Sequence, residues 1–282
     1  MRRTLIVGCG YLGRRVACRL AAEGDAVFGT TRTESKADAL RDLGITPVLM
    51  DAADPSPLAA LPPINRVVHA LGFDRNAGSS RREVVVAGLN RVLDALESVP
   101  RLVFTGTTGV YGQEDGAWID ETSPTAPTDE PGRVALEAET LLRTRRPDAV
   151  IVRLAGLYGP GRMIRRDALL AGTPIVGAAD SYLNLIHIDD AAAVVAAALE
   201  RAPAGATYLA CDDRPLSRHE FYRTMAELLH APAPRFEPGD GTRRERANRR
   251  ISNRKIREQL GVSLAYPDVR SGLAASLRAE TR

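Results

Sequence analysis

The sequence predicts an α/β protein built on a doubly wound parallel sheet, with a smaller lobe towards the C-terminus. Three observations lead to this fold class. Short, continuously apolar runs alternate with helical patterns through the first half of the chain, as in strands buried on both faces. A glycine-rich turn follows the first run, and the alternation stops after Gly161. The chain therefore combines one large sheet domain with a second unit of different organisation.

The elements of the first half follow from β-branched runs and from the residues that end helical patterns. Helices are expected over residues 12–23 and 35–43, where Gly24 and Gly44 suit the left-handed position after a helix. A longer helical pattern covers residues 81–97. The expected strands are residues 4–7, 26–30, 46–50, 66–70, 102–105 and 150–154.

The second half contains fewer and weaker signals. An alanine-rich helix begins at Asp189-Asp190, where the two acids suit the N-cap. Residues 208–211 form a further expected strand, and Ser217 with Glu220 predicts a capped helix running to about Leu229. A short helix capped by Ser252 is expected to end at Gly261.

Composition limits the function classes. At roughly 150 residues per domain, the 282 residues suggest about two domains. The chain is 44% hydrophobic and 26% charged, which is typical of an ordered soluble protein. No apolar run approaches the ~20 residues that span a bilayer, and a formal charge of +3 is too small to indicate nucleic-acid binding. Three scattered cysteines and four isolated histidines predict neither disulfides nor a metal site, so the expected location is cytoplasmic.

The turn after the first strand has the spacing of a dinucleotide-binding loop. Gly8 permits a tight turn, Gly10 lets the backbone approach a pyrophosphate, and Gly13 allows close helix–strand packing. Tyr11 and Leu12 lie between them, at the N-terminus of a helix whose free N–H groups attract phosphate. The strand–turn–helix–strand context makes this a Rossmann-type motif.

The end of the second strand indicates which dinucleotide binds. An NAD site usually has an acid there for the ribose 2′-hydroxyl, but this chain has Thr31 and Arg32 and no acid before Glu34. An arginine beside hydroxyls suits a 2′-phosphate, so NADP is favoured over NAD, unless Arg32 is simply a solvated residue. Asp51 after the third strand either meets the adenine or begins a turn.

The expected division of the chain follows from these motifs. Residues 1–160, with residues 184–212 returning to them, form the dinucleotide-binding domain. Residues 161–183 and 213–282 form the smaller substrate-binding lobe.

Four further segments resemble the extended and atypical short-chain dehydrogenase/reductase superfamily, which contains nucleotide-sugar epimerases and dehydratases. They are residues 105–112 (TGTTGVYG), 153–161 (RLAGLYGPG), 184–190 (NLIHIDD) and 248–253 (NRRISN). The resemblance spans nearly the whole chain in the correct order. It implies an NAD(P)-binding oxidoreductase or epimerase-like protein that acts on a hydroxyl, carbonyl or nucleotide-linked small molecule.

The chain departs from the superfamily at its usual Tyr-x-x-x-Lys pair. Aligning the downstream glutamate of that helix with Glu139 places Pro131 at the tyrosine position and Ala135 at the lysine position. Neither side chain can transfer a proton. Thr107 occupies the position of the Ser or Thr that polarises the substrate, although it also suits a strand-end cap. The catalytic machinery is therefore altered or reduced.

Two residues are candidates to replace the missing pair. Tyr111 is a substitute acid or else a packed aromatic, because a phenol without a nearby lysine titrates near ~10. Arg133 supplies the lost positive charge near the cofactor ribose, or else lies on a solvated helix face.

Other residues of the motifs are expected to line the substrate site. These are Tyr158, Asn184 and His187, the last of which is more often structural at a helix entry than catalytic. The basic segment, residues 243–257, has eight basic residues against one acid, and either binds a substrate diphosphate or forms a solvated face.

Two function classes remain open. Retention of Thr107 and the lining residues favours an NADP-dependent enzyme, with NAD as the alternative cofactor. Loss of the proton-transfer pair favours a non-catalytic NADP(H) sensor. The partners expected are a small-molecule substrate and a second copy of the chain in a homodimer, with neither nucleic acid nor membrane.

Overall fold

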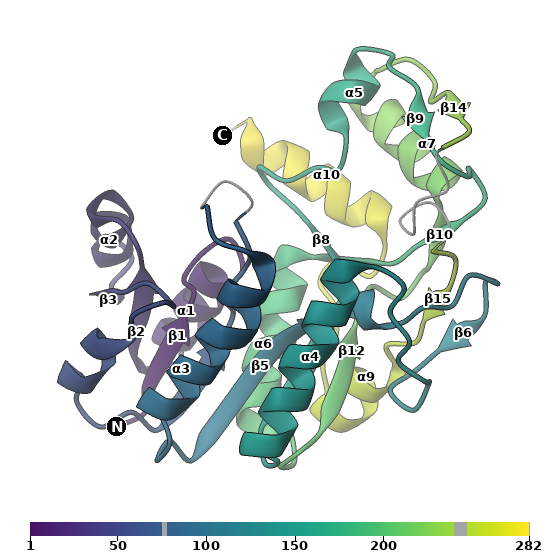
Figure 1. Cartoon of the computed structure of the whole chain (residues 1–282). Coiled ribbons are helices and arrows are strands. Elements are labelled where there is room, and N and C mark those ends of the chain that lie inside the picture. The colour runs from purple at the N-terminus through teal and green to yellow at the C-terminus, as the bar shows by residue number, and fades with distance from the viewer. Residues whose placement is uncertain (75–77, 240–246, 282) are drawn as a thin grey trace.

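A seven-stranded, fully parallel sheet organises the protein (Figure 1). The computed structural model describes residues 1–74, 78–239 and 247–281. The strand order is β12-β7-β5-β4-β1-β2-β3, the doubly wound arrangement that the sequence predicts. The six strands expected in the first half and the later one are all present. Their bounds are β1 Arg3–Val7, β2 Ala26–Thr31, β3 Thr46–Leu49, β4 Arg66–His69, β5 Arg101–Thr107, β7 Val150–Leu154 and β12 Thr207–Ala210.

Helices cover both faces of this sheet. In Figure 1, α3 (Gly88–Ala95) and α4 (Glu130–Arg145) lie in front of it, while α1 (Gly13–Ala22) and α6 (Ile188–Arg201) lie behind it. Each pair buries its apolar face against one side of the sheet in a separate hydrophobic cluster. Within the residues that the structure describes, no helix is both long and apolar enough to cross a membrane.

Local sequence signals explain where several helices begin and end. Gly24 and Gly44 adopt φ values of 89° and 72°, as expected after α1 and after α2 (Glu34–Arg41). Ser217 and Glu220 form the predicted reciprocal cap of α7 (Arg218–Leu229). The pattern over residues 81–97 differs from expectation, because it opens as a π-helical turn, η2 (Glu83–Ala87), before continuing as α3.

The smaller lobe has a hydrophobic cluster of its own, which includes Phe221, Tyr222 and Leu273. Two short strand pairs border it. Its elements are α5 (Arg166–Leu170), β9 (Ile175–Val176), β10 (Tyr182–Leu183), β13 (Leu216–Ser217), α7, β14 (Phe236–Glu237) and α10 (Val269–Glu280). Figure 1 shows α10 crossing between this lobe and the sheet domain.

The C-terminal part of the chain differs from the expected division. The short helix α9 (Arg254–Leu260) packs on α6 and β12, with Ile256 and Leu260 inside the hydrophobic core of the sheet domain. It therefore does not belong to the lobe, where residues 213–282 were expected. Helix α10 was not predicted at all.

Two further strand pairs connect the domain to the lobe. β8 (Gly156–Tyr158) pairs with β11 (Leu185–His187), and β6 (Trp118–Ile119) pairs with β15 (Arg250–Ile251). The second pair holds the segment before α9 beside the loop that follows β5. Chain segments far apart in sequence thus meet near the carboxyl end of β5.

Candidate functional site

The glycine-rich turn lies between β1 and α1, and each of its three glycines has a different environment. Gly8 has φ 90°, and an added Cβ would lie 2.6 Å from the Leu71 Cα. A Cβ on Gly13 would lie 2.2 Å from the Gly8 carbonyl oxygen. A Cβ on Gly10 meets nothing within 4 Å. Gly8 and Gly13 are therefore required by backbone packing, whereas Gly10 borders open space in which a pyrophosphate fits.

The position of this turn in the sheet suits a dinucleotide. β1 lies between β4 and β2, so the turn opens at the carboxyl edge, where the crossovers change direction. Helix α1 has no acid in its first turn and no side-chain cap among the described residues, with Leu12 at its N-cap. The Arg14 N–H in its first turn donates to the Gly10 carbonyl at 3.0 Å, and the positive end of the helix dipole lies at the glycine-rich turn, where it attracts an anion. Tyr11 lies beside this end and donates its hydroxyl hydrogen to the Pro160 carbonyl.

The residues expected to select the cofactor follow β2 and β3. Thr31 is buried at the end of β2, and the next residue, Arg32, forms an ion pair of 3.0 Å with Asp74 in the loop after β4. Asp51 accepts a hydrogen bond of 2.8 Å from the Ala53 N–H and is exposed. Asp51 thus begins a turn, which is one of the two roles that the sequence left open for it.

Thr107 ends β5 at the same edge of the sheet. Its Oγ1 accepts a hydrogen bond of 3.0 Å from the Gly109 N–H and caps the 3₁₀ turn Thr108–Val110. A hydroxyl can accept one hydrogen bond and donate another, so this contact is compatible with donation to a substrate carbonyl. Both roles considered for Thr107 therefore remain open to it.

A buried polar network lies directly behind that strand end. The Arg153 guanidinium on β7 binds the Glu139 carboxylate on α4 through contacts of 2.7 to 3.2 Å. Its Nη1 donates to the Tyr111 hydroxyl at 2.6 Å, and that hydroxyl donates to the Asp120 carbonyl at 3.1 Å. An added Cβ on Gly106 would lie 2.7 Å from the Glu139 Oε1. The network thus closes tightly against β5.

Tyr111 consequently has the packing role that the sequence left as its alternative. Its side chain is fully buried, and burial raises its pKa even though the neighbouring Arg153 acts in the opposite direction. A phenol that is harder to ionise and hydrogen-bonded on both sides is poorly placed to transfer protons.

The N-terminus of α4 is where the usual tyrosine and lysine would lie. Asp129 caps the helix by accepting from the Gly132 N–H at 2.8 Å, and Pro131 occupies the first turn. A Cβ on Gly132 would lie 2.6 Å from the Gly109 carbonyl oxygen, so this turn packs on the one that Thr107 caps. Pro131, the residue before Gly132, therefore lies in a helix turn that packs against the turn at the end of β5.

Arg133 is exposed on α4, as in the solvated position that the sequence left as its alternative. Its Nη1 donates to the Thr128 carbonyl at 3.1 Å, and its side chain lines a groove of about 860 Å³ between α4 and the η2–α3 helix. Leu136 and Val86 line the same groove. The helix turns the guanidinium away from the carboxyl edge, because Arg133 follows Pro131 by only two residues, which lie about 200° apart on a helix.

His187 is structural in this conformation. It is fully buried, its Nδ1 accepts from the Asp189 N–H at 3.3 Å, and its Nε2 lies 3.2 Å from the Ser276 Oγ on α10. Burial lowers its pKa to about 4, so the imidazole is neutral at neutral pH. His187 itself is the N-cap of α6, a role that the sequence assigned to the two acids. Asp190 instead accepts from the Ala265 N–H at 2.7 Å, in the loop before α10.

Tyr158 also supports α10 and is not exposed to a substrate. The phenol is fully buried against Gly272, where an added Cβ would lie 2.0 Å from the Tyr158 hydroxyl. Burial and the nearby Asp212 carboxyl both raise the pKa of Tyr158. Asp212 is only 2% exposed, and burial raises its pKa to about 8, with Asp213, Asp268 and Asp190 acting in the same direction.

Asn184 holds the segment that precedes α9. Its Nδ2 donates to the Arg249 carbonyl at 2.9 Å, and its Oδ1 accepts from the Ile251 N–H at 2.8 Å. Arg249 is 8% exposed, and its guanidinium donates to the Thr108 carbonyl at 3.1 Å. This places a buried cation beside the turn capped by Thr107. The sequence indicated only a basic segment, and did not single out Arg249.

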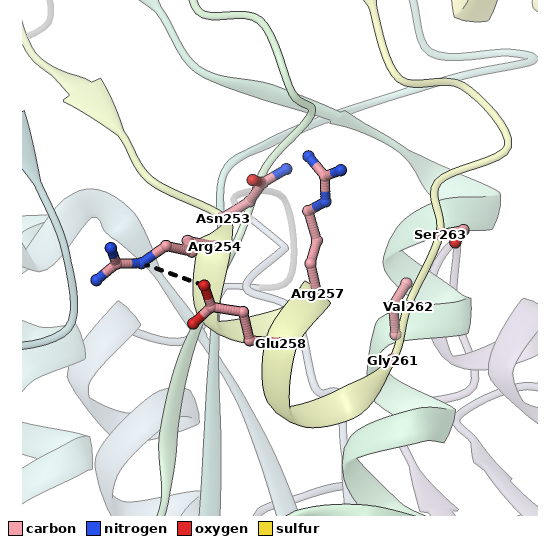
Figure 2. Close-up of a pocket in the computed structure, with 7 residues that line it drawn as sticks. All are labelled: Asn253, Arg254, Arg257, Glu258, Gly261, Val262 and Ser263. Carbon is pink, nitrogen blue, oxygen red and sulfur yellow. Dashed lines mark ion pairs between the residues drawn. The ribbon is translucent and has the colours of Figure 1, made fainter.

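The rest of the basic segment, residues 243–257, lies partly outside the described residues and partly on α9. Residues 243–246 lie outside the described residues. A pocket of about 530 Å³ lies along α9 (Figure 2), but Arg254 pairs there with Glu258 at 3.8 Å, and Arg257 pairs with Asp213 at 3.3 Å. Acids thus accompany both arginines, as on a solvated face. The pocket is lined by Asn253, Arg254, Arg257, Glu258, Gly261, Val262 and Ser263.

The family relationship agrees with this geometry. A model of the NAD dependent epimerase/dehydratase family matches residues 4–211. The chain belongs to this family. Protein YeeZ of Escherichia coli (strain K12) is 31% identical over 276 residues, covering 95% of this chain and 97% of that protein. The structure of a functionally unknown conserved protein from Silicibacter pomeroyi has a TM-score of 0.83, 31% identity and 99% coverage of both chains.

A further relative carries an enzymatic name. A 3-diazoavenalumate denitrifying reductase from a Streptomyces species is 26% identical over 96% of this chain and 99% of its own length. Together these relationships confirm the predicted superfamily and the Rossmann-type fold. The protein is thus an NAD(P)-binding member of the epimerase and oxidoreductase class.

Removing one partner of the buried Glu139–Arg153 pair should strongly destabilise the protein. We expect Arg153→Met to lower the free energy of unfolding by about 3–5 kcal/mol, because it leaves a buried carboxylate without its counter-charge. The double variant Arg153→Met with Glu139→Leu should recover much of the loss. Urea unfolding measures both; a loss under 1 kcal/mol in the single variant would contradict the buried pair.

Asp212 should make stability fall as pH rises. Its folded pKa of about 8 lies above the ordinary 3.8, so between those values the folded chain keeps a proton that the unfolded chain has lost. We expect Asp212→Asn to gain stability relative to the wild type across this window. Urea unfolding at about pH 5, 7 and 9 tests it, with the exposed Asp38→Asn as control. A difference independent of pH would refute the raised pKa.

Proposed function

We propose that the protein is an NADP-preferring enzyme that reduces or epimerises a hydroxyl or carbonyl compound, with a nucleotide-linked small molecule as its substrate class. The observation that supports NADP most directly is Arg32 at the end of β2, where an NAD site usually has an acid. It lies beside the turn in which Gly10 borders open space. A guanidinium there can form charge-assisted hydrogen bonds with a 2′-phosphate.

The residues around the carboxyl edge would bind the cofactor and polarise the substrate. NADP(H) supplies the hydride chemistry when bound. The Gly8–Gly13 turn and the N-terminus of α1 would hold its pyrophosphate, while Thr107 donates a hydrogen bond to the substrate oxygen. Arg249 adds a buried positive charge next to Thr107 that stabilises negative charge developing on that oxygen. A homodimer stays a prediction from the sequence.

Cofactor binding tests the first part of the proposal. NADPH should bind more tightly than NADH by ~1–3 kcal/mol, and Arg32→Ala should remove that preference. Gly10→Val should abolish binding of both while the fold is kept, because its side chain would fill the space beside the turn and nothing in the protein opposes it. Calorimetric titration and circular dichroism measure the two effects. Native affinity in a folded Gly10→Val would exclude the turn as the phosphate site.

Turnover tests the second part. Without a tyrosine and lysine at Pro131 and Ala135, the protein lacks general acid–base help typically worth ~10²–10⁴-fold. Generic alcohols and ketones should therefore be turned over well below ~1 per second. Pro131→Tyr with Ala135→Lys should raise the rate. Ordinary rates in the wild type would mean that another group carries the proton, and tight NADPH binding with no turnover on a broad panel would favour the sensor.

A further inference from the structure

The Arg32–Asp74 ion pair crosses the cofactor turn. Arg32 directly follows β2, and Asp74 lies in the loop after β4. Because β1 lies between these two strands in the sheet, a contact between their following loops passes over the carboxyl end of β1. The Gly8–Gly13 turn begins there. The pair, 3.0 Å long and about half exposed on both sides, thus spans the site in which the adenosine half of a dinucleotide binds.

The loop that carries Asp74 is attached to the protein on both sides of the site. At its start, Leu71 lies against the Gly8 turn, where a Cβ on Gly8 would meet the Leu71 Cα. Further along, the Phe73 ring lies under the Arg81 guanidinium at 4.3 Å, and Arg81 pairs with Glu130 of α4 at 3.3 Å. Asp74 therefore directly follows a segment that is fixed by contacts of Leu71 and Phe73, which do not involve Arg32.

We propose that Asp74 sets the cofactor selectivity of this protein by competing with the 2′-phosphate for Arg32. When NADP binds, its 2′-phosphate must either displace the Asp74 carboxylate from the Arg32 guanidinium or pair with that guanidinium beside it. In NAD the same carboxylate can accept a hydrogen bond from the ribose 2′-hydroxyl, the task that an acid at the end of β2 usually performs. This inference rests on the proposed function.

The two charges therefore have opposite effects on selectivity. Arg32 favours the phosphorylated cofactor, while Asp74 repels a phosphate and favours the free hydroxyl. Neither side chain is buried, so exchange of partners costs little, and the competition has the size of an exposed ion pair. Such pairs change equilibria by about two- to five-fold and are weakened by salt.

The test is a double-variant cycle on the whole protein, with the dissociation constants of NADPH and NADH measured by calorimetry. Asp74→Asn should bind NADPH about two- to five-fold more tightly and NADH more weakly, which raises the NADPH preference. In the Arg32→Ala background the same change should strengthen NADPH binding less than it does in the wild type, because only the direct repulsion between Asp74 and the phosphate is left to remove. The gain should shrink in about 0.5 M salt, beyond the reach of screened charges.

Asp38→Asn is the matched control, since Asp38 is an exposed aspartate on α2 that pairs with Arg41. It should leave both affinities unchanged. An Asp74→Asn protein with the wild-type ratio of NADPH to NADH affinity, or an equal gain for both cofactors, would overturn the inference while leaving the proposed NADP preference intact. A wild type that binds neither dinucleotide would overturn the proposed function as well.

Discussion

The buried contact between Arg153 and Glu139 is the constraint on which the candidate site depends. It joins β7 to α4, the helix whose first turn carries Pro131, and the same guanidinium binds Tyr111 in the loop that follows β5. A buried ion pair contributes little net stability, because desolvation offsets most of the attraction, but breaking it is costly. Its consequence is therefore geometric. It holds the N-terminus of α4 against the turn that Thr107 caps. Position 106 on β5 requires glycine, because a Cβ there would lie 2.7 Å from the Glu139 Oε1.

A second set of buried polar contacts attaches the C-terminal helix. His187 meets Ser276, Tyr158 lies beneath Gly272, and Asp190 receives N–H groups from the loop before α10. Each of these groups belongs to a motif that resembles a superfamily signature. Here the motifs position α10 and the lobe, and so shape the wall of the site from a distance. The neutral His187 is well suited to this, since a protonated ring could not accept at Nδ1 from the Asp189 N–H.

The sheet and the cofactor turn could be predicted from the sequence because both depend on local, strongly patterned signals. The largely apolar run of β7 predicts a strand buried on both faces, as observed. Gly8 and Gly13 belong to one tight local turn, in which Gly8 has φ 90° and Gly13 packs on the Gly8 carbonyl. Helix α10 was missed because four of its six apolar residues are small or lie outside the buried cluster, and only Val269 and Leu273 join the hydrophobic cluster of the lobe. Polar contacts with distant segments, which the sequence does not show, complete its attachment. The roles of Arg133 and Arg249 depend on the direction of each side chain in three dimensions. Sequence spacing placed the first near the ribose, whereas the helix turns it into the outer groove, and the strand pairing of β15 with β6 brings the second to β5.

The arrangement that results separates binding from proton transfer. Arg249 and Arg32 place positive charge at two points along the carboxyl edge, one beside the turn that Thr107 caps and one directly after β2. Guanidinium groups stay charged at any ordinary pH, so they can hold phosphates or polarise an oxygen but cannot supply a proton at a useful rate. The phenol and the imidazole closest to the expected chemistry are both buried in structural contacts, with pKa values moved away from neutrality. A site of this kind retains recognition of an anionic dinucleotide, while Tyr111 and His187, the two side chains that the sequence offered as proton carriers, are held in structural contacts with Arg153 and Ser276.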